Sequence, residues 1–281
     1  MTTTTAPIAP TVVESPAQRA RWAIHDVLVM TRRNLLRVVK EPSDAILTLS
    51  IPIMMVLTFG YVFGSAMDVA GGAAGYRAYF MPGVFVMTLV YSIASTATGV
   101  AIDIDKGVVD RFRSMPLARS ALLAGRSLAD VVRTVATIAV LVGCGLLVGW
   151  RWHEGWARVL GAVGLLLLMS FALIWVGIYL GLVVPNPDTA SLAVYPLAFP
   201  LTVLSSAFVP PTAMPGVLGT ISEWNPLTAT IDATRELFGS PGLTGDSWIA
   251  QNAVLMAVVW PLLILAVVVP LAVRRYQRLS R

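Results

Sequence analysis

The residues of this sequence that could take part in chemistry lie mostly in two short polar stretches. The first, residues 103–119, reads DIDKGVVDRFRSMPLAR. On a helix, Asp103 and Lys106 are three residues apart and Lys106 and Asp110 are four apart, so each pair stabilises an exposed helix modestly. Phe112 then projects among charges, as in a contact surface for another protein. The alternative interpretation is a solvated loop with ordinary positive charge.

The second stretch, residues 225–235, reads NPLTATIDATR. Asn225 is a residue type that caps helices, and Pro226 suits the first helical position because its missing N–H would be unpaired there anyway. Asp232 and Arg235 can pair across one turn. Taken alone, this pattern predicts a short, well-capped helix.

Several kinds of chemistry are excluded by the residues that are present. The two lysines, Lys40 and Lys106, are not followed by Ser or Thr, so neither completes a phosphate-binding G-x-x-x-x-G-K-[ST] loop. The two histidines, His25 and His153, have no carboxylate at ligand spacing and predict no metal site. We therefore expect no enzyme activity, no ATP hydrolysis and no cofactor on this chain.

The composition predicts a membrane protein. The chain of 281 residues is 57% hydrophobic and 12% charged, with a mean hydropathy of +0.77, whereas a soluble domain carries about 25% charged residues. Its apolar runs each approach the ~20 residues that a helix needs to cross a bilayer, and none contains Asp, Glu, Lys or Arg. The runs are residues 45–63, 79–101, 134–150, 159–184, 190–209 and 253–273. The predicted fold class is therefore all-α, with six transmembrane helices.

The N-terminal part precedes these runs. Residues 1–18 are rich in Thr, Pro and Ala and predict a disordered cytoplasmic tail, followed by one transmembrane domain over 19–281. Residues 19–40 place apolar side chains on one face and cations on the other, as in an amphipathic helix that lies in the membrane interface. An ordinary juxtamembrane segment is the equal alternative.

The cations predict the topology. The net charge of +5 and the pI near 9.7 do not indicate a nucleic-acid partner, because the cations flank the apolar runs as the positive-inside rule requires. With both termini cytoplasmic, sixteen cations face the cytoplasm: Arg19, Arg21, Arg32, Arg33, Arg37, Lys40, Lys106, Arg111, Arg113, Arg119, Arg126, Arg133, Arg274, Arg275, Arg278 and Arg281. Four are external: Arg77, Arg151, Arg158 and Arg235.

Two long connections follow from this topology. Residues 102–133 form a charged cytoplasmic connection, and residues 210–252 form an external connection rich in Pro, Trp and Leu. A structureless loop of that length is unusual. Its apolar content therefore predicts short external helices that re-enter the outer leaflet between spans five and six.

A stripe of small polar residues marks the second span. Thr88, Ser92, Ser95 and Gly99 share one helical face and could line a translocation path. Hydrogen-bonded helix packing is the commoner use of such residues and the favoured interpretation. The G-x-x-x-G pairs at 145–149 and 177–181 predict close helix contacts within the chain.

Two other kinds of membrane protein stay open. A proton-coupled carrier usually keeps ionisable residues inside its spans, and none is expected here, which disfavours an ATP-independent carrier. A membrane scaffold without transport activity is the second alternative, and the absence of any associated ATPase would favour it.

The stretch 103–119, its continuation to Arg133 and the pattern at 225–235 resemble the membrane subunits of type 2 ABC exporters. The resemblance is greatest to the daunorubicin-resistance permease branch, and RFRSMP at 111–116 is its most specific part. It extends from about residue 19 onward and includes the amphipathic helix, six spans and cytoplasmic termini. It implies a permease subunit of an exporter of hydrophobic or amphipathic drugs, antibiotics or lipids.

The resemblance also implies partners and roles. A separate ATPase would carry ATP and Mg, and a second permease subunit would complete a homodimer in a bacterial-type cell membrane, where membrane lipids and a hydrophobic substrate contact it. The implied coupling residues are Asp103, Lys106, Asp110, Arg111, Phe112 and Arg113. The implied external gate contains Asn225, Pro226, Asp232 and Arg235. Thr88, Ser92 and Ser95 would line the path.

Overall fold

The computed structural model describes residues 25, 27–36, 42–63, 72–107, 121–184, 186–240, 245 and 247–279. Within these ranges the chain is helical, with turns and no strand. The predicted tail at 1–18 lies outside them, and so does most of the N-terminal half of the amphipathic segment, whose residues 27–36 form a helix.

Four of the described helices are long and apolar enough to cross a membrane. They are α4 (Gly72–Asp105), α6 (Ala121–Val148), α7 (Trp156–Val183) and α12 (Ala253–Leu279). Three shorter apolar segments accompany them: α2 (Pro42–Leu57), which continues into the π-helix η1 (Thr58–Phe63), and α8 (Pro187–Val203). The protein is therefore a helical membrane protein, and its described residues include four helices long and apolar enough to span a bilayer.

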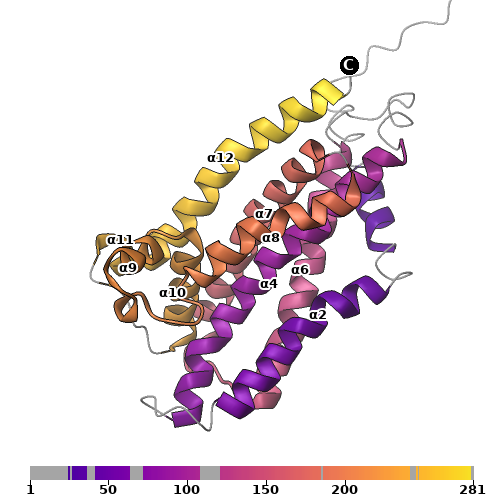
Figure 1. Ribbon diagram of the computed structural model, residues 1–281. Helices are drawn as coiled ribbons and strands as arrows, with labels where there is room; N and C mark the ends of the chain where they lie inside the picture. The colour runs from indigo at the N-terminus through magenta and orange to yellow at the C-terminus, as the bar shows by residue number, and fades with distance from the viewer. Residues whose placement is uncertain are drawn as a thin grey trace, which may run out of the picture.

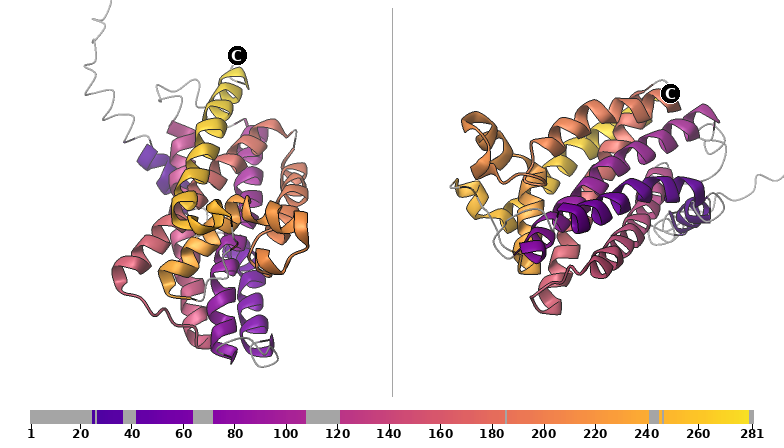
Figure 2. Two further views of the ribbon diagram at one scale, coloured as in Figure 1. Left: turned by 90° about the vertical axis from the view of Figure 1, so that its left-hand side faces the viewer. Right: turned by 60° about the horizontal axis from the view of Figure 1, so that its bottom comes forward.

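The long helices lie side by side along one direction, with α4 between α7 and α8 on one side and α2 on the other (Figure 1). The short helical segments between α8 and α12 gather at one end of this bundle in Figure 1, and this end faces the viewer in the left view of Figure 2. These segments are the 3-10 helix η2 (Pro211–Ala213), α9 (Gly216–Glu223), α10 (Pro226–Phe238) and α11 (Trp248–Gln251).

Hydrogen bonds identify which chain segments share an end. At one end Thr31 donates to the carbonyl of Gly125 at 3.1 Å, and Arg275 donates to that of Leu182 at 3.3 Å. At the other end the N–H of His153 donates to the carbonyl of Phe238 at 3.0 Å. The start of α6 and the end of α12 therefore lie together, opposite α10.

Helix α7 packs closely on α4 through the second predicted glycine pair. An ideal Cβ on Gly181 would lie 2.5 Å from the carbonyl oxygen of Ala97 and 2.8 Å from Cβ of Val100. At Gly177 it would lie 3.0 Å from the carbonyl oxygen of Ile93. The interpretation of this G-x-x-x-G pair as internal packing is confirmed, because both glycines remove the side chain that would separate the two helices.

Much of the predicted connection at 102–133 is helical and continuous with the helices on either side. Helix α4 continues to Asp105, where Gly107 follows with φ 62°, and α6 begins at Ala121 rather than at 134. The helix that contains the candidate span Leu123–Val148 therefore includes Arg126, Asp130 and Arg133, which precede the predicted apolar run 134–150. The predicted run was bounded by the last charged residue before it. These charges pair with one another, however, and so tolerate a helical, partly buried position.

We predict that Gly181→Ala destabilises the chain while Gly164→Ala does not. Both changes raise helix propensity equally, but a methyl group at Gly181 would press on α4, whereas nothing lies within 4 Å of a Cβ at Gly164. Overpacking of this kind costs about 1–3 kcal/mol. Thermal unfolding of the two purified variants in one detergent measures the difference, and equal midpoints would contradict this packing.

Candidate functional site: two buried polar networks

The predicted gate residues converge on Arg235, whose side chain is 1% exposed. Its Nη1 donates to Asp232 Oδ1 at 2.7 Å and to Ser206 Oγ at 3.1 Å, and its Nη2 donates to the carbonyl oxygen of Ser206 at 2.7 Å. Its Nε donates to the carbonyl oxygen of Tyr79 at 2.9 Å, and its Cζ lies 3.7 Å from the centre of the Tyr79 ring. We call this set of contacts the Arg235 joint.

Capping interactions at both ends of α10 position Asp232 and Arg235 for these contacts. Asn225 caps the helix by accepting from the N–H of Leu227 at 2.9 Å, and Pro226 is its first residue, as predicted. The amide of Asn225 also donates to the carbonyl of Leu201 at 2.7 Å. Gly239 ends α10 with φ 71°, the left-handed conformation that glycine adopts without strain.

The Arg235 joint connects three parts of the chain. Tyr79 belongs to α4, Ser206 follows α8, and Asp232 and Arg235 belong to α10. The charge of Arg235 is compensated by Asp232, and every nitrogen of its guanidinium has an acceptor. Because all these donors already have acceptors within the protein, the Arg235 joint is a structural contact and not a ligand-binding site.

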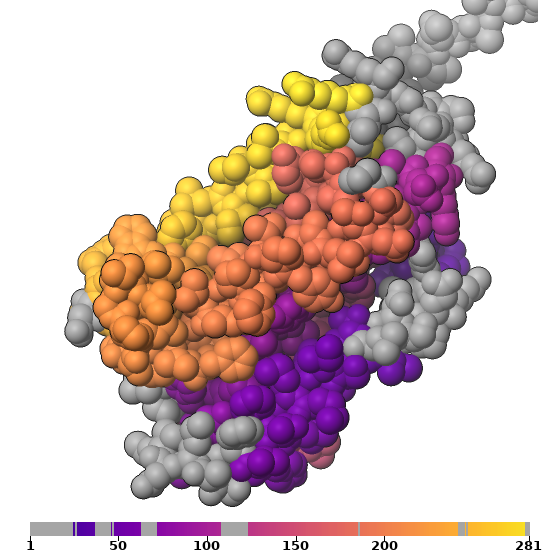
Figure 3. Space-filling view, in the orientation of Figure 1, coloured from indigo at the N-terminus to yellow at the C-terminus, as the bar shows by residue number. Residues whose placement is uncertain are grey.

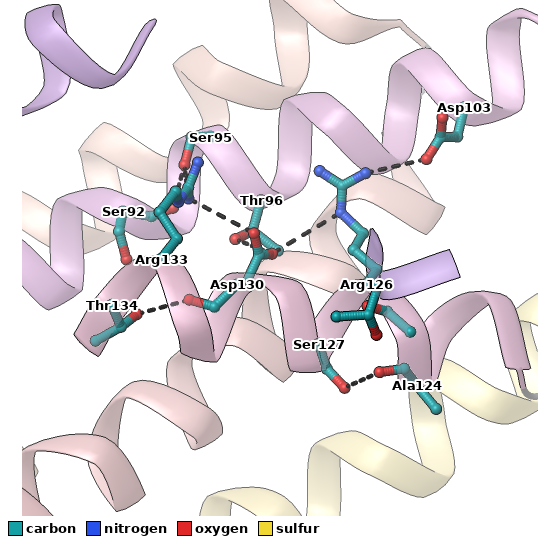
Figure 4. A network of polar contacts seen from close by, with 12 residues as sticks. Ser92, Ser95, Thr96, Asp103, Ala124, Arg126, Ser127, Asp130, Arg133 and Thr134 are labelled. Atoms are coloured by element: carbon teal, nitrogen blue, oxygen red, sulfur yellow. Dashed lines mark hydrogen bonds and ion pairs between the residues drawn. The ribbon is translucent and has the colours of Figure 1, made fainter. Parts of the chain in front are cut away.

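A second network lies near the other end of the bundle, between α4 and α6, with Asp130 between Arg126 and Arg133 (Figure 4). Thr96 donates to Asp130 Oδ2 at 2.9 Å. The same carboxylate lies 3.9 Å from Arg126 Nε and 3.8 Å from Arg133 Nη2, and Arg133 donates to Ser95. We call these contacts the Asp130 network.

Arg126 links the Asp130 network to the end of α4. Its Nη1 donates to Asp103 Oδ2 at 3.0 Å, and Arg33 in the N-terminal helix reaches the other oxygen of Asp103 at 3.3 Å. Gly99 makes this possible, because a Cβ there would collide with the guanidinium of Arg126. Three separate helical segments are therefore joined through one buried carboxylate.

A cavity of about 350 Å³ opens beside the Asp130 network. The predicted stripe residues Thr88, Ser92, Ser95 and Gly99 line it. Their hydroxyls donate to carbonyls of their own helix, for example Thr88 to Val84 at 2.8 Å. Ser92 and Ser95 are therefore partly exposed beside the cavity, whereas Thr88 and Gly99 are buried, and a role in substrate passage stays a prediction.

The predicted coupling residues are described only in part. Asp103 is buried in its ion pairs, and Lys106 is exposed just before the end of the described segment. Asp110, Arg111, Phe112 and Arg113 lie outside the described residues. Asp103, whose side chain is 11% exposed, therefore joins helical segments, and its role in coupling stays a prediction.

Sequence reasoning missed several residues of the two networks. Arg126, Asp130 and Arg133 follow one another at spacings of four and three, which is one face of a helix. This spacing is visible in the sequence, but it indicates a shared helical face only if α6 begins before the apolar run at 134–150. Ser206 and Tyr79 carried no signal, because their role depends on which distant helix lies beside them.

Residues 25–238 match the ABC-2 type transporter family. The chain is 35% identical over 80% of its length to the daunorubicin resistance ABC transporter permease protein DrrB1 of Streptomyces coeruleorubidus, of which it covers 78%. It is 23% identical over 82% of its length to the putative transport permease ycf38 of Cyanophora paradoxa, covering 78% of it. A probable doxorubicin resistance ABC transporter permease protein, DrrC of Mycobacterium tuberculosis, is 26% identical over 53% of each chain.

We expect Arg235→Gln to destabilise the chain by about 3–5 kcal/mol, because it leaves the buried carboxylate of Asp232 without its cation. The double variant Asp232→Asn with Arg235→Gln should be less destabilised than the single variant, since it leaves no unpaired charge. Chemical unfolding of the purified protein measures both.

Arg158→Gln is the matched control for this prediction. Arg158 pairs with Glu154 at 3.2 Å, but its side chain is 58% exposed, and exposed pairs contribute about 0–1 kcal/mol. Equal losses at Arg158 and Arg235 would show that burial of the Arg235 joint does not determine its contribution.

Proposed function

This chain belongs to the ABC-2 type transporter family as the membrane subunit of an ABC exporter, and we propose that it exports hydrophobic or amphipathic compounds with energy from a separate ATPase. ATP and Mg bind to that ATPase and not to this chain. The match over residues 25–238 is the observation that carries the proposal. The drug-resistance names of two relatives support drugs, antibiotics or lipids as the class of substrate.

The proposed topology has six crossings and both termini in the cytoplasm of a bacterial cell. The described spans α4, α6, α7 and α12 account for four, and α2 with η1 and α8 would supply the other two. The end of α12, with Arg275, lies beside the end of α7 and therefore on the proposed cytoplasmic side. Helices α9 and α10 would then be the re-entrant helices of the outer side, within one domain over residues 19–281.

The proposed coupling route begins at residues 106–113, which would rest on the ATPase. From there Asp103 passes movement to α6 through Arg126 and to the N-terminal helix through Arg33, since both guanidinium groups contact its carboxylate. A tilt of the contact segment would in this way move α4, α6 and the N-terminal helix together. Asp103 acts as a connector in this route, and Lys106 is its described exposed residue.

On the outer side, the Arg235 joint would keep α10 fixed to α4 and to the end of α8, so that these parts move as one gate. Two copies of this chain would form a homodimer with the substrate path between them. The exposed apolar side chains of α8, among them Leu192, Tyr195 and Phe199, support a membrane or subunit contact along that helix.

A second candidate function, an ATP-independent carrier, is favoured by one observation. Asp130 lies buried inside α6, where a proton-coupled carrier would keep an ionisable group. Its partners Thr96, Arg126 and Arg133 account for its presence structurally. We therefore rank this function below the exporter.

We predict that the chain co-purifies from its native membrane with a soluble subunit that contains G-x-x-x-x-G-K-[ST]. Arg111→Glu or Phe112→Ala should abolish stimulation of that ATPase by substrate while the chain still inserts into the membrane, because the proposed contact is lost. Arg158→Glu, a charge reversal at the opposite end of the bundle, is the control. Full stimulation in both contact variants would contradict the coupling route.

Transport by the reconstituted complex separates the two candidate functions. Export in proteoliposomes should require ATP and continue when a protonophore removes the pH gradient. Substrate movement without ATP, driven by a pH gradient and lost in Asp130→Asn, would favour the carrier instead.

A further inference from the structure

Two arginines and one carboxylate line the cavity beside the Asp130 network. The charged side chains that line it are Arg126, Asp130 and Arg133, so two guanidinium groups share one carboxylate. Asp103 lies behind Arg126 and is itself shared with Arg33. Arg126 therefore has Asp103 as a second carboxylate partner, whereas Arg133 has only the carboxylate of Asp130 nearby among the described residues.

Arg133 is the cation of this cluster with the weakest described pairing. Its nearest described carboxylate oxygen, Asp130 Oδ1, lies 3.8 Å from Nη2, beyond hydrogen-bond distance. The hydrogen bond that it makes goes to the neutral hydroxyl of Ser95. Its side chain is 26% exposed and borders the cavity, so it remains accessible to an incoming anion.

Arg126 adds a second donor at the same wall. Its Nε is buried and has no hydrogen-bond acceptor among the described residues, although Asp130 compensates its charge from 3.9 Å. The guanidinium lies against Gly99, a position that a side chain would block. Buried donors are normally satisfied, so the guanidinium of Arg126 is incompletely paired on its Nε side.

The remaining lining combines hydroxyl and apolar groups. Ser95 and Thr98 of α4 and Thr137 of α6 lie near the two cations, while Leu35, Leu49 and Leu89 supply apolar surface. On the molecular surface, a strip of α4 lies between α2 and α8 (Figure 3). The volume of about 350 Å³ falls within the ~300–1,000 Å³ of small-molecule sites.

We propose that this cavity binds the anionic head group, carboxylate or phosphate, of an amphipathic molecule, with Arg133 as the main contact and Arg126 as the second. The acid pairs with the guanidinium groups, and the apolar body lies on the leucine side chains. This inference deepens the proposed function and rests on it, because it gives the exported compound an acidic end. It makes Arg133 a specificity residue of the path that Ser92 and Ser95 line.

The test measures binding to the purified full-length chain in phosphatidylcholine nanodiscs, without any ATPase. The probe is dodecanoic acid carrying a nitrobenzoxadiazole fluorophore, and its methyl ester is the uncharged counterpart. The acid should bind roughly tenfold or more tightly than the ester, because a charged hydrogen bond is lost in the ester. Empty nanodiscs measure partition into the lipid, which is subtracted.

Variants assign the binding to this cavity. Arg133→Gln should weaken binding of the acid roughly tenfold or more and leave the ester unchanged, whereas Arg133→Lys should restore part of it. Ser95→Asp should also abolish the preference for the acid, because it places a carboxylate beside Arg133 without removing the cation. Arg158→Gln, an arginine at the other end of the bundle, should change nothing.

Nanodiscs that contain phosphatidylglycerol distinguish the source of the head group. If this lipid displaces the probe, the natural ligand is a phospholipid phosphate; if it does not, the ligand is a separate amphipathic acid. Equal binding of acid and ester, or unchanged binding in both Arg133→Gln and Ser95→Asp, would overturn the proposal. Because no ATPase is present, this result is independent of whether the chain associates with one.

Discussion

The guanidinium of Arg235 imposes the strongest constraint on this structure, because a cation with almost no exposure must have all its donors satisfied. The acceptors come from three parts of the chain: Tyr79 of α4, Ser206 after α8, and Asp232 of α10 itself. Removing any one of these partners would leave a buried donor or charge unpaired, which costs more than the contact itself contributes. This end of the bundle is therefore held in one arrangement.

The opposite end is organised differently. Asp103 and Asp130 share three arginines, and the contacts there are longer and more exposed than at Arg235. Such ion pairs can exchange partners at lower cost, because solvent or a ligand can replace one of them. The chain thus combines a fully paired, buried joint at one end with a more exposed and less tightly paired cluster at the other.

Glycines allow close packing around α4 near the Asp130 network. Gly177 and Gly181 bring α7 against the backbone of α4, and Gly99 leaves the space in which Arg126 crosses to Asp103. In each case the missing Cβ lets a backbone or a guanidinium approach α4. Helix α4 therefore connects the two ends: it provides Tyr79 for the Arg235 joint, and Thr96 and Asp103 for the contacts at the other end.

The sequence by itself determined the helical membrane class, the cap at Asn225, the Asp232–Arg235 pair and the family, because these depend on local spacing and on composition. It did not determine that α6 begins at Ala121, since charged residues at 126–133 look like a loop until their partners on α4 are known. Tyr79, Ser206 and Gly99 likewise acquired their roles only from tertiary contacts. The physical reason is that a charge or polar group can be buried only where a distant segment supplies its partner, and local spacing does not contain that information.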